Sequence, residues 1–353
     1  MHERDPIWVP PLRYDVETTL SRKKNPYFEH AEAEYFLAER GGEVVGRIAA
    51  THNRLHNETH DDTVGFWGWF ECIDDQSVAH ALFDAADAWL RARGLTVSRG
   101  PASFSTNDQC GLLVDGFETR PTLMMPHNPR YYPVLVEGAG YAKAKDLFCL
   151  EGGDHDKYKP VPERAVRGAK LVKERLGLTV RPLNMKEFPR ELEHIKRLYN
   201  ASWEKNWGFV PLTDHEIDHL AEQFKPIAIP DIVPFVEKDG QVIAFGLTLP
   251  DLNEALVGNK RGRLIPFLLK ALYMLKAHKL RRARILLLGV LPEWRGRGVD
   301  AVLFYEIWEQ SAKHQIYWGE GGWVLEDNPI MWAGLEKMGF RIYKTYRMYD
   351  RSL

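Results

Sequence analysis

The chain has 353 residues, a formal net charge of −2 and 44% hydrophobic content. This length predicts two domains, each able to enclose its own core, and the near-neutral charge argues against a nucleic-acid partner. Cys72, Cys110 and Cys149 are far apart and odd in number, which argues against a disulfide framework or a zinc site, and we expect no metal. The first residues lack the apolar region of a signal peptide, and no apolar run reaches the roughly 18 residues that a membrane span needs. We therefore expect a cytoplasmic protein without a transmembrane segment.

The first half begins with a predicted β-hairpin at residues 39–46, where a Gly-Gly turn separates two short strands. An apolar strand follows from Val64 to Ile73, and then a helix at residues 78–93 whose apolar side chains share one face. Asp74 or Asp75 can cap this helix. Two carboxylates at this helix N-terminus would repel a phosphate group.

The segment from Gly100 to Gly111 is rich in small polar residues and turn formers. One interpretation is an ordered surface loop whose side chains satisfy their own backbone. The other is a substrate-recognition loop, with Ser105, Asn107 and Asp108 as the contacts.

The second half begins after a linker at 151–162. The patterns predict a helix at about 163–176, a strand at 178–183, and helices at about 188–203 and 214–224. The connection between the last two helices contains Trp207, a candidate for an apolar substrate pocket or for ordinary packing.

A basic amphipathic segment spans residues 260–284. Three interpretations remain open for it. It is a helix that packs on the body with a solvated basic face, a surface for anionic lipid or an acyl carrier protein, or a lid over an acyl chain.

A buried strand from Ile285 to Leu291 precedes the basic, Gly-rich turn 295–298, and a helix begins at Val299. This order directs free backbone N–H groups and the positive end of a helix dipole at one point, which suits a phosphate. A Walker loop is excluded because no Gly-Lys-Ser/Thr ends the turn. The turn also fits a dinucleotide-binding fingerprint poorly, because it has only two of the three glycines that this motif requires.

The turn resembles the acetyl-CoA loop of the GNAT acyltransferase superfamily, Arg/Gln-x-x-Gly-x-Gly/Ala, with Asp300 departing from the last position. Downstream, a strand, Asn328, a short helix and Gly339-Phe340 resemble the end of a GNAT domain. The resemblance covers roughly the last seventy residues. The family often has a tyrosine that serves as the general acid at the position of Leu335 in this chain.

Similar residue pairs recur at an offset of about 200 residues, such as Gly42 with Gly240 and Asn128 with Asn328. We therefore expect an α/β (α+β) fold of two tandem GNAT-like domains, each a central mixed β-sheet flanked by helices. The predicted divisions are a degenerate N-terminal domain at 1–150, a linker and helix at 151–177, and a C-terminal domain with the acyl-CoA loop at 178–353.

The resemblance implies transfer of an acetyl or longer acyl group from acyl-CoA to a small-molecule amine or hydroxyl acceptor held between the domains. Three alternatives remain: a non-catalytic relative that binds CoA or a metabolite, a Fem-like aminoacyl transferase, and an N-acyl amino acid synthase. The acyl-CoA contacts implied are Val290, Leu291, Arg295, Gly296, Arg297, Gly298, Val299, Asp300 and Asn328. The candidate catalytic residues are Glu326, Glu71 and Tyr346, with Ser105, Asn107, Asp108 and Trp207 as substrate contacts.

Overall fold

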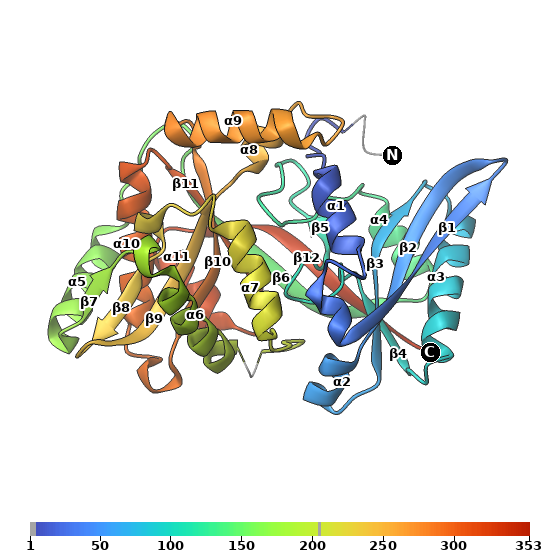
Figure 1. Cartoon of the computed structure of the whole chain (residues 1–353), viewed down its shortest axis with the longest axis horizontal. Coiled ribbons are helices and arrows are strands. Elements are labelled where there is room, and N and C mark those ends of the chain that lie inside the picture. Colours follow the sequence, from blue (N-terminus) through green and yellow to red (C-terminus); the bar gives the residue numbers. More distant parts are fainter. Residues whose placement is uncertain (1–4, 204–205) are drawn as a thin grey trace.

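The computed structural model describes residues 5–203 and 206–353, and both halves consist of strands with helices packed against them (Figure 1). The elements of the first half are α1 (Arg13–Leu20), β1 (Ala31–Arg40), β2 (Glu43–Asn53), α2 (Arg54–His60), β3 (Val64–Cys72), α3 (Gln76–Arg91), β4 (Val97–Gly100), β5 (Leu112–Asp115), α4 (Tyr132–Gly138) and β6 (Ala142–Gly153).

The second half begins with a helix that packs along α10. Its elements are α5 (Glu163–Leu176), β7 (Thr179–Arg181), α6 (Phe188–Trp203), α7 (Asp214–Phe224), β8 (Phe235–Lys238), β9 (Gln241–Pro250), α8 (Asn253–Leu256), α9 (Leu264–Lys276), β10 (Arg282–Val290), α10 (Val299–Lys313), β11 (Trp318–Leu325), α11 (Pro329–Lys337) and β12 (Arg341–Ser352).

In the described part of the chain, one mixed sheet of 12 strands runs through both halves in the order β1-β2-β3-β4-β12-β6-β11-β10-β9-β8-β7, with β5 paired to β12. The last strand of each half lies in the other half. β6 pairs with β11, and β12 pairs with β4 and β5, while β6 and β12 pair antiparallel with each other. This exchange joins the two halves through backbone hydrogen bonds.

The predicted hairpin at 39–46 and the predicted helices are confirmed. The β1–β2 turn has Gly41 and Gly42 at positive φ, and the β8–β9 turn has Asp239 and Gly240 in the same region, which suits tight turns. The strand predicted at 178–183 is shorter in the structure, where only β7 (Thr179–Arg181) forms. β6 continues to Gly153, beyond the predicted start of the linker at residue 151.

Each half has its own apolar core. In the first half, α3 packs Leu82, Phe83 and Leu90 against β2 and β3. In the second, α10 packs Val302 and Leu303 against β9 and β10. The fold therefore consists of two units, each with its own core, whose strands form one sheet.

Candidate functional site

The site begins where β10 and β11 separate. These strands pair in parallel only from Arg282 with Trp318 to Ile285 with Gly321. Leu286 is an extra residue in the pairing of β10 with β9, a bulge at the point of separation. β11 instead follows β6, so a gap opens between two strands that are neighbours in the sheet.

A cavity of about 210 Å³ occupies this gap and extends to the first half of the chain. Its walls are mostly apolar and come from β10, β11, α7, α10 and α11. The first half contributes Thr106, Asn107, Asp108 and Met124, and the predicted contacts Trp207 and Asn328 also line it. Among the described lining residues, Asp108 is the one carboxylate.

The loop that carries Asp108 is fixed to the second half by hydrogen bonds. Thr106 Oγ1 donates to the Gly208 carbonyl at 2.6 Å, and Asn107 Nδ2 donates to the Val210 carbonyl at 3.0 Å. The Tyr199 hydroxyl of α6 donates to Asn107 Oδ1 at 2.7 Å. The predicted recognition loop and the aromatic connection after α6 therefore meet at one cavity.

Asp108 has an unusual environment for a carboxyl group. Its Oδ2 accepts hydrogen bonds from Ser105 N–H and Ser105 Oγ, at 3.3 and 3.1 Å, while no hydrogen bond to Oδ1 is found among the described residues. Burial, reinforced by the charge of Glu216 and opposed by the Ser105 hydrogen bonds, raises the pKa of Asp108 to about 7. Ser105 is itself buried, and it holds Asp108 without lining the cavity.

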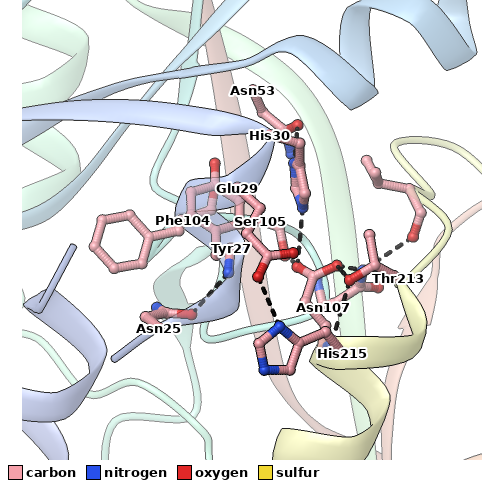
Figure 2. Close-up of polar contacts among 12 residues, drawn as sticks. Asn25, Tyr27, Glu29, His30, Asn53, Phe104, Ser105, Asn107, Thr213 and His215 are labelled. Carbon is pink, nitrogen blue, oxygen red and sulfur yellow. Dashed lines mark hydrogen bonds and ion pairs between the residues drawn. The ribbon is translucent and has the colours of Figure 1, made fainter. Parts of the chain in front are cut away.

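An ion pair across the two halves lies beside this loop. His30 Nε2 is 3.2 Å from Glu216 Oε1, and His30 Nδ1 is 3.1 Å from Asn53 Oδ1 (Figure 2). Burial lowers the pKa of His30, but attraction to Glu216 outweighs this and the pKa is raised. Burial raises the pKa of Glu216, but His30 and the Thr213 N–H outweigh it and the pKa is lowered. Both groups are therefore charged near pH 6.

The loop before α10 presents unpaired donors. Among residues 5–203 and 206–353, no acceptor bonds to the backbone N–H groups of residues 296–301. Gly296 and Gly298 have φ of 68° and 83°, and nothing lies within 4 Å of a Cβ built on Gly296. The Arg297 guanidinium lies 5.1 Å from the Trp294 ring centroid and has no ion pair in the part of the chain described. This loop fits an anion such as a pyrophosphate.

Some predicted acyl-CoA contacts have other partners in this structure. The Arg295 guanidinium donates to the carbonyls of Val290, Ala201 and Ser202, at 3.2, 3.1 and 2.9 Å. Leu291 N–H donates to the Ile243 carbonyl at 3.0 Å, within the sheet. Arg295 therefore holds the end of α6 against the loop, and a ligand role for its side chain stays a prediction.

Three further predicted contacts lie at helix starts. The Asp300 carboxylate is in the first turn of α10 and does not cap it, since Gly298 is the N-cap and no side chain accepts there. Asn328 caps α11 by accepting from Met331 N–H at 3.3 Å. Val299 is buried and anchors the start of α10 in the core.

The matching position in the first half is closed. After β4, Ala102 N–H donates to the Trp67 carbonyl at 2.8 Å, so the chain stays against β3 instead of separating from it. Asp75 caps α3 by accepting from Ser77 N–H and Val78 N–H, at 2.9 and 3.4 Å. The helix end that would receive a phosphate is already occupied by a carboxylate.

The three predicted catalytic residues are not brought together, and none lines the cavity. Glu326 Oε2 accepts from Lys143 Nζ at 2.7 Å, and Glu71 Oε2 accepts from the Tyr132 hydroxyl at 2.7 Å. Tyr346 is fully buried and donates to the Pro126 carbonyl at 3.1 Å. Leu335, at the position of the family's tyrosine, does line the cavity.

Sequence reasoning missed Tyr199 and the His30–Glu216 pair. Tyr199 lies within an ordinary amphipathic helix pattern, and His30 and Glu216 are far apart in sequence, so no local motif marks them. Among the described residues, no cluster of His, Cys, Asp and Glu could hold a metal. In the same part of the chain, no helix is both long and apolar enough to cross a membrane.

Comparison with solved structures identifies the fold. A tandem GNAT protein from the clavulanic acid biosynthesis pathway matches with a TM-score of 0.57 at 13% identity, over 99% of this chain and 90% of that one. A GCN5-related N-acetyltransferase from Sphaerobacter thermophilus matches with a TM-score of 0.51 at 12% identity, over 90% of this chain and 80% of that one. The fold is that of tandem GNAT proteins, as the sequence predicted.

Curated relatives identify the family, although no family model matches the chain. A bacterial ceramide synthase of Caulobacter vibrioides is 37% identical over 361 residues, covering 100% of this chain and 92% of the relative. The protein YghO of Escherichia coli is 34% identical over 359 residues, covering 100% of this chain and 90% of the relative. The chain belongs to the family of these two proteins. Its fold is that of GNAT proteins, and one of the two relatives is named as a synthase.

Proposed function

We propose that this tandem GNAT protein is an N-acyltransferase that joins a long acyl group, delivered as acyl-CoA, to the primary amine of a long-chain amino alcohol. The product would be a ceramide-type amide. The name of the Caulobacter relative supports this acceptor class. The apolar walls of the cavity suit a hydrocarbon chain, and they argue less for a polar metabolite.

The observation that carries the proposal is Asp108 in this apolar cavity. An amine dissolved at neutral pH is mostly an ammonium ion, and it must lose a proton before its nitrogen can attack a carbonyl carbon. A carboxylate with one free oxygen pairs with the ammonium group, and a pKa of about 7 suits a base that accepts its proton. Asp108 thus replaces Glu326 and Glu71 as our candidate base.

Other residues would position the reactants. Acyl-CoA would supply the acyl group as an activated thioester, and the unpaired N–H groups at 296–301 with Arg297 would hold its pyrophosphate. Asn107 and Tyr199 border the same cavity as Asp108 and would orient the polar end of the acceptor. Burial raises the pKa of Tyr199, so its hydroxyl stays protonated and keeps donating to Asn107 Oδ1, which holds Asn107 in place.

The test is an amide-forming assay with purified protein. Palmitoyl-CoA and sphinganine are incubated with the enzyme, and the product is identified by mass spectrometry before and after mild alkaline hydrolysis, which cleaves esters and spares amides. We expect an alkali-stable product with sphinganine and much less with ethanolamine, which lacks the chain. Calorimetry with CoA runs in parallel. If CoA binds but no acyl-CoA and amine combination gives an amide, a non-catalytic CoA-binding protein replaces this proposal.

A further inference from the structure

Helix α9 lies along the outer edge of the second half (Figure 1). One of its faces is apolar and open to solvent. Phe267 and Ala271 point inward and are buried with residues of α8. The exposed side chains on the other face are Ile265 (71%), Leu268 (51%), Leu269 (66%), Leu272 (51%) and Tyr273 (56%). They share one face because they recur at helical spacing. A contiguous apolar surface of this kind marks an interaction site.

Cations flank both ends of this face. Six lysines and arginines precede, interrupt or follow the stripe and form no ion pair with a carboxylate in the part of the chain described: Lys260, Arg261, Arg263, Lys270, Lys276 and Lys279. No Asp or Glu occurs from Ala255 to Pro292. The uncompensated positive charge calls for an anionic partner.

A surface groove at the N-terminal end of α9 gives this charge a defined location. Lys260, Arg261, Arg263 and Lys270 line the groove, with Phe267 among the side chains around it. Arginine and lysine side chains around one groove suit a phosphate group. The apolar stripe begins directly beside it.

We infer that α9 docks this protein on the surface of an anionic phospholipid bilayer, with its apolar face at the headgroup–acyl boundary and the basic groove on lipid phosphates. A helix with an apolar face and surrounding cations lies in the plane of such an interface. The cations stand at both ends of a convex apolar stripe, which matches a plane of negative charge over hydrocarbon.

The position of α9 gives the docking a consequence for the cavity. A short turn connects α9 to β10, and β10 forms one wall of the cavity. Docking would therefore hold the cavity near the bilayer in a fixed orientation. The inference is independent of the proposed function, because lipid binding is measured without acyl transfer.

Sedimentation with lipid vesicles tests the inference. We expect binding to phosphatidylcholine vesicles that contain roughly 30% phosphatidylglycerol, weaker binding to pure phosphatidylcholine, and a loss at high salt. Leu269→Glu should lower the partition coefficient about tenfold or more, and Leu171→Glu, at a leucine of similar exposure (63%) on α5, should not. The double variant Arg261→Glu/Arg263→Glu should lower the partition coefficient about fivefold for each arginine replaced. Arg164→Glu, on α5, should have little effect on it.

A fluorescent label provides a second readout that does not depend on loss of binding. All three native cysteines are buried, so Leu268→Cys gives one reactive thiol for an environment-sensitive dye. Its emission should shift to the blue with anionic vesicles, and the same dye at Leu171→Cys should not respond. The inference is overturned if the wild-type protein does not bind anionic vesicles at low salt. Binding that the α9 variants leave intact also overturns it, as does an interaction with an acyl carrier protein but not with vesicles, or a dimer that Leu269→Glu dissociates.

Discussion

Asp108→Asn should separate catalysis from stability in this protein. Asparagine keeps the size of the side chain, and its Oδ1 can still accept the hydrogen bonds that Ser105 donates to the carboxylate. It cannot take a proton from an ammonium group. We expect the rate of amide formation to fall by a factor on the order of 10²–10⁴, the usual contribution of a general base.

Asp108→Asn should lower the catalytic rate but raise the stability of the folded protein, because folding raises the pKa of the Asp108 carboxyl group. A change from 3.8 to about 7 corresponds to about 4 kcal/mol against the ionised form in the folded state, at about 1.4 kcal/mol per tenfold change. Water that enters the cavity reduces this figure, so it is an upper value. The folded state binds the extra proton between about pH 4 and 7, and wild-type stability therefore falls as the pH rises through this range.

Two measurements check the reasoning. Urea denaturation at about pH 8 should find Asp108→Asn as stable as the wild type or more stable, with the gain gone at about pH 4. The pH profile of kcat/KM should rise through about 7 in the wild type and lose that limb in the variant. An active Asp108→Asn with the wild-type profile would refute the assignment of the base. A large destabilisation at pH 8 would show that the ionised carboxylate is structural.

Three further expectations follow from the same geometry. Arg297→Glu should weaken CoA binding about tenfold or more in calorimetry, whereas Asp75→Arg, at the closed end of α3, should leave it unchanged. Since the pKa of His30 is raised and that of Glu216 is lowered, their pair stabilises most between about pH 4.5 and 6.5; His30→Gln should cost about 1–3 kcal/mol at pH 5.5 by urea denaturation and less at pH 8.5. Leu220→Trp, which narrows the cavity, should lower kcat/KM for a long-chain amine more than for a short one, and an equal loss for both would show that the acceptor chain lies elsewhere.

Local patterns in the sequence predicted the elements that local physics determines. The predicted helices at 163–176 and 214–224 match α5 and α7. Their apolar spacing and their end residues are local signals, since each involves contacts within about one turn of the helix. The glycines of the loop before α10 predict an anion site, and its N–H groups have no acceptor among the residues that the structure describes. Asp75, predicted as a cap of α3, accepts two N–H groups there.

Long-range contacts determine the parts that the sequence did not reveal. Asn107 and Asp108 were predicted as contacts from polar density alone, but the enclosure that raises the pKa of Asp108 comes from packing between the halves. The sequence makes Glu326 a candidate base because the strand Ile285–Leu291 carries no carboxylate and Glu326 stands at the end of the next strand. The exchanged strand β6 brings Lys143 onto that carboxylate, so its charge is already paired. No periodicity within a segment encodes such an exchange.

The exchange also limits how the cavity can open. β6 and β12 lie at the centre of the sheet, and the Arg99–Asp350 and Arg347–Asp146 ion pairs, each at 2.7 Å, join chain segments from both halves beside them. Moving the halves apart would break backbone pairing along two long strands, which is costly compared with moving a loop. The 206–212 connection lines the cavity, and the loop with Asp108 binds it through Thr106 and Asn107. For the proposed reaction, opening of this contact between loops would give access to Asp108, and the sheet would keep the two sides of the cavity in register.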